Sequence, residues 1–351
     1  LPAGGLTARS WRKVAALLAP AFVSNSEHSE LSMTRLVMLD PSTQDRLERI
    51  RPFLPEGWDI FTTASRTPED QLAALTGASF AITGDAAVTA PMMAVKGLRA
   101  VHKWGVGYDN IDLVAAREND VRVLRTAGSN AVAVAETTLG LILALNRNIV
   151  RGHTGILEGK WRKAELSPTS LRLSGKTVGI IGMGYIGKAL AKLLTGFGCT
   201  IIYTKRTPLT DVENSELRVR FVSLEELLHN ADVVTLNCEL NASTRNLINR
   251  ETLALMKPDA LLVNAARGGV MVEADVADAI RAEKLRGAGI DVFAEEPVPS
   301  DNPLIGLDRV ITTPHVGAIS ADSFAPSIKR MIGNLAAVAE GREPNAIDIL
   351  V

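Results

Sequence analysis

The sequence predicts an α/β protein with two doubly wound parallel sheets, and three observations support that fold class. The chain has 351 residues, which suggests two domains, and 46% of them are hydrophobic, which is enough for a sizeable core. Short apolar runs alternate with helical segments in two long stretches. This alternation is typical of parallel sheets with helices on both faces.

The first alternating stretch begins at Arg35. Its predicted strands cover residues 35–39, 59–62, 80–83 and 100–103, and its predicted helices cover residues 41–50, 68–75 and 91–95. Pro68 stands in the first turn of its helix, where the N–H that proline lacks has no intrahelical partner in any case.

A long helix is expected next, over residues 132–150. Its apolar positions are nearly continuous, as in the run from Leu141 to Leu143, so most of its surface should be buried. Residues 161–173 are predicted to form an irregular surface segment.

The second alternating stretch begins at Thr177. Its predicted strands cover residues 177–181, 200–203, 232–236, 260–264, 288–292 and 310–312, and this number of strands matches one doubly wound sheet. A last helix, residues 323–340, is expected to pack back on the first domain. One domain would then comprise residues 33–130 plus 319–351, with the other, residues 131–318, inserted into it.

The first 32 residues differ from the rest of the chain. Basic residues come early, a short apolar run follows, and Pro20 interrupts it. We interpret residues 1–32 as a leader outside the fold, with a natural start near Met33. An organellar transit segment is the alternative.

Charge and composition exclude several classes of protein. The formal net charge is −1, so no positive field would attract nucleic acid or an anionic membrane. No apolar stretch reaches the ~18 residues that a membrane span needs. Cys199 and Cys238 lie in or beside apolar runs and are expected to be buried thiols, which fits a reducing, cytoplasmic setting. No metal site is predicted.

A glycine-rich loop follows the strand at residues 177–181. It reads Gly182-Met183-Gly184-Tyr185-Ile186-Gly187, and a helix is predicted after it, over residues 188–197. The first glycine permits a tight turn, the second lets the backbone approach a pyrophosphate, and the third allows close helix packing. Since the helix N-terminus adds free N–H groups, the loop predicts a dinucleotide site. A plain glycine-rich turn is the alternative.

The end of the next strand indicates which dinucleotide is bound. An NAD site normally has Asp or Glu here, which accepts hydrogen bonds from the ribose 2′-OH. This chain has Thr204, Lys205 and Arg206 instead, and no carboxylate before Asp211. Because Lys and Arg pair with a 2′-phosphate, NADP(H) is preferred, with NAD(H) as the alternative. The opposing interpretation is two ordinary solvated basic side chains.

Three more strands end near residues that suit acid–base chemistry. Arg267, Glu296 and His315 follow the strands at 260–264, 288–292 and 310–312. In an open α/β sheet, the ligand crevice lies past the carboxyl ends of the strands. Each side chain alone would be an ordinary loop residue, but three on one sheet edge predict an active site.

These segments resemble the signatures of the D-isomer-specific 2-hydroxyacid dehydrogenases, in order, spacing and flanks. The resemblance runs from about Met33 to the C-terminus and includes residues 105–112 and the run from Val134 to Glu136. Within this family, the chain resembles the glyoxylate and hydroxypyruvate reductases. The resemblance implies a Rossmann dinucleotide-binding domain inserted into a flavodoxin-like substrate domain.

The resemblance also implies a role for each residue at the sheet edge. Arg267 would bind the carboxylate and keto oxygen of the substrate, and His315 would be the acid/base. Glu296 would hydrogen-bond the imidazole, and Asp291 would support the cofactor. The chemistry agrees, because ketone reduction needs a proton donor with a pKa near neutrality, and a carboxylate stabilises its imidazolium.

The loop after strand 100–103 is expected to bind substrate. By resemblance, the backbone amides of Val106 and Gly107 would bind the substrate carboxylate. Lys103 would add positive charge to that pocket, or would only buttress it. The chain departs from the family where Asn237 and Glu239 stand at positions that commonly hold His and Pro.

We therefore expect an NADPH-dependent reductase of small 2-keto acids, of the glyoxylate or hydroxypyruvate type, that forms D-2-hydroxy acids. The alternatives are an NAD-linked dehydrogenase of a hydroxy acid such as 3-phosphoglycerate, and a nucleotide-sensing scaffold of the same fold. In the family, the region of the long helix beginning near Val132 forms a dimer interface, so a homodimer is expected.

Overall fold

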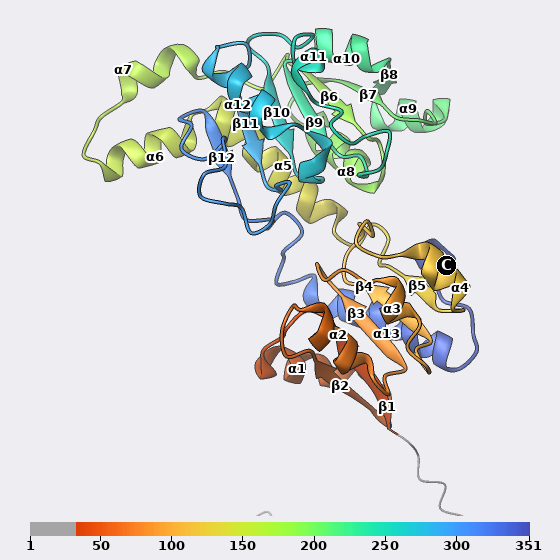
Figure 1. Cartoon of the computed structure of the whole chain (residues 1–351). Helices are drawn as coiled ribbons and strands as arrows, with labels where there is room; N and C mark the ends of the chain where they lie inside the picture. The colour runs from red at the N-terminus through yellow and green to blue at the C-terminus, as the bar shows by residue number, and fades with distance from the viewer. Residues whose placement is uncertain (1–32) are drawn as a thin grey trace, which may run out of the picture. The chain divides into compact units, whose positions relative to one another are not determined.

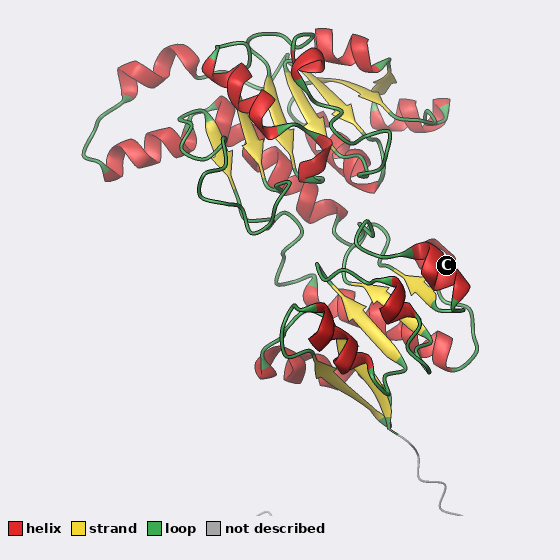
Figure 2. Ribbon diagram, viewed as in Figure 1, coloured by secondary structure: helices red, strands yellow, loops and turns green. Residues whose placement is uncertain are grey.

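The structure, a computed structural model, describes residues 33–351, so the predicted leader lies outside the described residues. Two parallel sheets are present, each with helices on both faces (Figures 1 and 2). The α/β fold class with two parallel-sheet domains is therefore confirmed. Within residues 33–351, no helix has the length and apolar character needed to span a membrane.

The first sheet has the strand order β2-β1-β3-β4-β5, and all its pairs are parallel. The strands are β1 Thr34–Met38, β2 Trp58–Thr62, β3 Phe80–Thr83, β4 Ala100–Lys103 and β5 Arg122–Leu124. This is the flavodoxin-like order of doubly wound folds, in which the direction of winding reverses between β1 and β3.

Helices cover both faces of this sheet. One face carries α2 Pro68–Leu75, α3 Ala90–Met93 and α4 Leu113–Glu118, and the other carries α1 Gln44–Ile50 and α13 Phe324–Ala339. Ile328 and Leu335 of α13 share a buried core with Leu36 and Met38 of β1. The C-terminal helix therefore stabilises the sheet formed by the N-terminal part of the described chain.

The second sheet has the order β12-β11-β10-β9-β6-β7-β8. Its strands are β6 Thr177–Ile181, β7 Thr200–Thr204, β8 Val219–Phe221, β9 Val233–Leu236, β10 Leu261–Asn264, β11 Gly287–Ile290 and β12 Val310–Thr312. Counted from β6, this is the Rossmann order with one further strand, and the winding reverses between β6 and β9. Loops that follow those two strands meet at the usual ligand crevice of such folds.

Two apolar cores lie on opposite faces of the second sheet. One contains side chains of α5 Ala131–Asn146, α8 Tyr185–Thr195 and α9 Asp211–Leu217. The other contains side chains of α10 Leu224–Asn230, α11 Arg250–Leu253 and α12 Glu273–Arg281. The strands β6, β7, β9, β10 and β11 are thus buried on both sides, and this explains why their sequences are continuously apolar. The outermost strand β8 is largely exposed.

The single long helix expected over residues 132–150 is wrong, because the structure has two helices there. The helix α5 ends at Asn146, and α6 Ile149–Leu157 begins after Asn148, which has a left-handed backbone (φ 52°). Asparagine tolerates this conformation, and its Nδ2 donates to the hydroxyls of Thr169 and Ser170, 3.0 Å away in each case. The segment expected to be irregular contains a short helix, α7 Lys163–Leu166.

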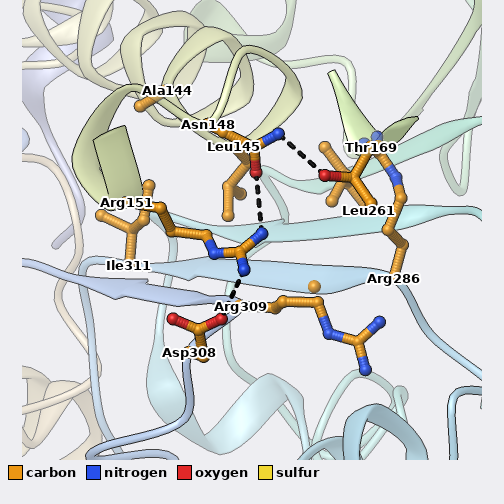
Figure 3. A pocket seen from close by; sticks show the side chains of 11 residues that line it. Ala144, Leu145, Asn148, Arg151, Thr169, Leu261, Arg286, Asp308, Arg309 and Ile311 are labelled. Carbon is orange, nitrogen blue, oxygen red and sulfur yellow. Dashed lines mark hydrogen bonds and ion pairs between the residues drawn. The ribbon is translucent and has the colours of Figure 1, made fainter. Parts of the chain in front are cut away.

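A small cavity of about 50 Å³ lies where β10, β11 and β12 begin (Figure 3). Arg151 of α6 crosses it and pairs with Asp308, at 2.7 Å, while its Nη1 donates to Asn148 (Figure 3). Because ligands of such sheets bind at the carboxyl ends of the strands, we interpret this network as an anchor of α6.

Candidate active site

His315 lies in the loop after β12, and Asp291 holds that loop in place. The backbone of His315 is left-handed (φ 53°), and its amide donates to the carbonyl of Asp291 over 2.8 Å. The buried carboxylate of Asp291 accepts from the Thr313 hydroxyl (2.6 Å) and from the amides of Val316 (3.0 Å) and Gly317 (2.8 Å). An uncommon backbone conformation persists only where the surroundings impose it, and Asp291 supplies those contacts.

The side chain of His315 is paired with Glu296. Its Nδ1 lies 2.7 Å from Glu296 Oε2, while Glu296 Oε1 accepts from the Phe293 amide over 2.9 Å. This arrangement keeps a proton on Nδ1, which donates it in a hydrogen bond to the carboxylate of Glu296. His315 Nε2 has no hydrogen-bond partner among residues 33–351 and is the nitrogen that can exchange a proton with a substrate.

Electrostatics strengthen the pair. The hydrogen bond that His315 donates to Glu296 raises the pKa of His315, although burial and the charge of Arg267 act in the opposite direction. Burial acts to raise the pKa of Glu296, but the hydrogen bonds from His315 and Phe293 outweigh it, so the pKa is lowered. The pair therefore favours an imidazolium beside an ionised carboxylate, which is the form that donates a proton.

Arg267 follows β10, and its guanidinium is held on two sides. Its Nε donates to Asp109 Oδ1 over 2.9 Å, and its Nη1 donates to the Ala266 carbonyl over 2.8 Å. Its Nη2 lies against Gly107, where any side chain would collide with it. The structure thus brings together Arg267 and Gly107, which the sequence predicted for the same substrate carboxylate.

A cavity of about 960 Å³ contains the histidine–carboxylate pair. His315, Glu296 and Phe293 line it from the second sheet, and Asp85, Trp104 and Arg46 are among the residues that line it from the first. The volume lies at the upper end of the ~300–1,000 Å³ range of ligand pockets.

The side chain of Lys103 and the carbonyl of Val106 bind other parts of the chain, whereas the substrate-binding role of the Val106 amide stays a prediction. The ammonium of Lys103 contacts the Gly84 carbonyl and Asn110 Oδ1, and burial lowers the pKa of this lysine. The carbonyl of Val106 accepts from Arg125 Nη1 over 3.2 Å. Lys103 therefore buttresses the neighbouring loops in this structure, and its role in substrate binding stays a prediction.

The glycine-rich loop joins β6 to α8, and its geometry suits a pyrophosphate. No side chain caps the N-terminus of α8, so its first N–H groups remain available, and the space around the Cα of Gly184 is open. Gly182 has φ 97°, and a Cβ there would lie 2.6 Å from the backbone of Asn237. Met183 is buried, Ile186 is half-buried, and Gly187 packs on the Gly182 carbonyl. These residues fit a dinucleotide.

The basic residues after β7 lie beside this loop. Lys205 Nζ lies 3.4 Å from the Met183 carbonyl, and Arg206 is exposed, with no ion pair to any residue that the structure describes. Thr204 ends β7, beside Ile181 at the end of β6. Both positive charges therefore lie at the edge of the sheet where a dinucleotide would extend its adenosine half.

The sequence predicted no role for Asp109, and it predicted that Asp291 supports the cofactor. In the structure, Asp109 orients Arg267, and Asp291 binds the histidine loop. Asp109 lies within the motif at residues 105–112, which was the only available signal. The cofactor role of Asp291 stays a prediction.

A phosphate loop at the point of reversal of a doubly wound sheet, with a histidine–carboxylate pair on the same sheet edge, defines a nicotinamide-dependent oxidoreductase. Residues 139–317 match the family model described as D-isomer specific 2-hydroxyacid dehydrogenase, NAD binding domain. The chain belongs to the D-isomer specific 2-hydroxyacid dehydrogenase family.

Known proteins of several activities are similar to this chain. A hydroxypyruvate reductase from Thermotoga maritima is 42% identical over 67% of this chain and 76% of its own length. A D-3-phosphoglycerate dehydrogenase from Methanocaldococcus jannaschii is 35% identical over 83% of this chain, which spans 55% of that protein. A crystal structure of a Thermus thermophilus protein has a TM-score of 0.80 at 36% identity, covering 91% of this chain and 100% of its own.

Proposed function

We propose that the protein reduces small 2-keto acids of the glyoxylate or hydroxypyruvate type to D-2-hydroxy acids, with a preference for NADPH. The observation that carries this proposal is the His315–Glu296 pair, because it supplies a proton donor in a cavity. The similarity to a hydroxypyruvate reductase supports the same class of substrate.

Each active-site residue has a defined task in this reaction. Arg267 Nη2 and the Gly107 backbone bind the substrate carboxylate, since a planar guanidinium matches the coplanar oxygens of a 2-keto acid. Asp109 and the Ala266 carbonyl keep that guanidinium in orientation. When bound, the nicotinamide supplies the hydride. His315 donates the proton from Nε2 to the keto oxygen, and Glu296 stabilises the charged imidazole before transfer.

The residues after β7 support the preference for NADPH. Lys205 and Arg206 would pair with a 2′-phosphate, and no carboxylate stands at the position that holds a ribose hydroxyl in NAD sites. The test is the initial rate of NADPH and NADH oxidation with glyoxylate, hydroxypyruvate and pyruvate.

The double variant Lys205→Asp/Arg206→Ala should lose the preference for NADPH. Arg172→Ala/Lys176→Asp is the matched control, because it changes the charge equally in the segment that precedes β6, at the opposite end of that strand from the phosphate loop. Faster oxidation of NADH by the wild type would refute the cofactor assignment. Failure to turn over any of the three acids would refute the proposed reaction and favour a scaffold.

We also propose a homodimer. The sequence placed its interface at the helix beginning near Val132, but most of α5 packs inside its own domain, against α8 and β10. Two strongly exposed apolar side chains lie beyond the end of α5, with Leu157 at 74% and Trp161 at 80% exposure. Sedimentation at several concentrations tests this proposal, and Trp161→Glu should dissociate the dimer.

We keep a cytoplasmic setting as a proposal, supported by the two free cysteines, Cys199 and Cys238. Fractionation of cells that express the full chain tests it, and recovery of the protein outside the cytoplasmic fraction would refute it.

A further inference from the structure

We propose that Arg46 and Arg49 form a second anion-binding subsite in the active-site cavity, so that the preferred substrate is a 2-keto acid with another anionic group at its far end. This inference rests on the proposed function and specifies its substrate class. The anion is a phosphate or a second carboxylate, which guanidinium groups bind in the same manner.

Both arginines line the cavity that contains His315, and aromatic rings hold both in place. The guanidinium carbon of Arg46 lies 4.4 Å from the centre of the Trp104 ring, and that of Arg49 lies 4.3 Å from the centre of the Phe324 ring. The two rings contact each other, with centroids 5.9 Å apart. These contacts reduce the mobility of two side chains that are otherwise flexible.

The placement of the two rings connects this subsite to the reaction centre. Trp104 directly precedes the loop that contains Gly107, which lies against Arg267. Phe324 begins α13, just after the segment that follows His315, and Ser323 and Ser327 on either side of it also line the cavity. The aromatic pair therefore supports the arginines on the first sheet and borders the cavity of His315.

Neither arginine forms an ion pair with any residue between 33 and 351. Burial lowers the pKa of Arg46, the charge of Asp40 acts in the opposite direction, and the nearby charge of Arg49 lowers the pKa further. The carboxylate of Asp40 lies close by, but it already accepts hydrogen bonds from the amides of Gly84, Asp85 and Ala86. Two like charges are thus held together without a dedicated counter-charge, and a bound anion would relieve their repulsion.

Besides Glu296, two acids line the cavity, Asp45 and Asp85, and neither is dedicated to this pair. Asp45 lies in the first turn of α1, where a carboxylate offsets the partial charge of the helix N-terminus. Asp85 is exposed and within electrostatic range of His315 and Lys103 as well as Arg46, so its charge is shared among three cations.

The experiment compares hydroxypyruvate with 3-phosphohydroxypyruvate, for the phosphate, and with oxaloacetate and 2-oxoglutarate, for the carboxylate. We expect wild-type kcat/KM to be highest for one of the acids with a distal anion. Arg46→Gln/Arg49→Gln should lower kcat/KM for that acid by about tenfold or more, mainly through KM, and should change hydroxypyruvate less than about twofold. Arg46→Lys should retain part of the preference.

Arg35→Gln is the matched control, because Arg35 also stacks on an aromatic ring, Phe61, at 4.0 Å, but does not line the cavity. Thermal melting checks that each variant is folded. An equal loss on hydroxypyruvate and on the distal-anion acids would show a structural role and overturn the inference. A wild type that turns over hydroxypyruvate but does not favour a distal anion would overturn the inference and leave the proposed function standing.

If the wild type reduces no keto acid, the proposed function fails, and calorimetry then tests the subsite by itself. Tighter binding of 3-phosphoglycerate than of D-glycerate, lost in Arg46→Gln/Arg49→Gln, would support an anion subsite. Equal binding of the two ligands would overturn it.

Discussion

Replacing Glu296 by Gln tests the acid/base assignment directly. The substitution removes the negative charge that lies 2.7 Å from His315 Nδ1 and keeps an oxygen that can accept the same hydrogen bond. Because the hydrogen bond that His315 donates to Glu296, together with the negative charge of that carboxylate, raises the pKa of His315, the variant should have a lower histidine pKa. Reduction requires protonated His315, so the alkaline decline of kcat/KM should begin at a lower pH in the variant.

The size of the effect follows from the geometry. A hydrogen bond between charged groups contributes about 1.5–3 kcal/mol to stability. The side chains of His315 and Glu296 are 36% and 35% exposed, so solvent screens the pair, and we take about half of that value. The remaining ~0.7–1.5 kcal/mol corresponds to a roughly three- to tenfold loss of kcat/KM on the alkaline side.

The assay is the pH dependence of kcat/KM for NADPH-linked reduction of the best 2-keto acid. Glu295→Gln serves as the control, since this neighbouring carboxylate forms no hydrogen bond with His315. An unchanged pH profile in Glu296→Gln, or an equal shift in Glu295→Gln, would refute the assignment of the carboxylate.

Three further predictions concern packing and stability. Gly107→Ala should lower kcat/KM by about tenfold or more, because a Cβ there displaces the Arg267 guanidinium, while the melting temperature changes little; normal kinetics would contradict the placement of Arg267. Asp348→Asn should lower the free energy of unfolding by about 2 kcal/mol near pH 7, measured with denaturant, because it removes the charge of a buried carboxylate that pairs at 2.6 Å with the partly exposed Arg330. Burial acts to raise the pKa of Asp348, but hydrogen bonds from Arg330 lower it overall, so its contribution is present above the ordinary pKa of aspartate and is lost in acid, where wild type and variant should converge. Burial lowers the pKa of His102 from 6.5 to about 4, so on acidification the unfolded chain takes up a proton before the folded chain does. As the pH is lowered from 6.5 to 4, the free energy of unfolding should therefore fall more steeply in the wild type than in His102→Gln.

Much of the fold could be predicted from sequence because uninterrupted apolar strands that alternate with helices carry a clear pattern. The strands β3, β4, β6 and β12 begin and end at the predicted residues. The strands β5 and β8 were missed because an arginine interrupts each three-residue apolar run, whereas the equally short β12 contains no charged residue. The break between α5 and α6 was missed because it depends on hydrogen bonds from Asn148 to residues about twenty positions away.

The candidate site shows the same division. The phosphate loop and the sheet-edge residues were predictable because parallel strands place their carboxyl ends on one edge. The contact between Arg267 and Asp109 joins residues 158 positions apart, and the pairing of Arg46 with Trp104 joins different elements of the first domain. No local pattern encodes such contacts, because they depend on how loops approach one another after folding.

The left-handed backbone conformation of His315 has a kinetic consequence. Since Asp291 binds the Thr313 hydroxyl and two loop amides, contacts within the chain itself orient the imidazole. The entropic cost of ordering the His315 side chain is incurred when the chain folds. Substrate binding therefore does not incur that cost again. Substitutions that loosen this loop should therefore slow turnover while leaving substrate affinity nearly intact.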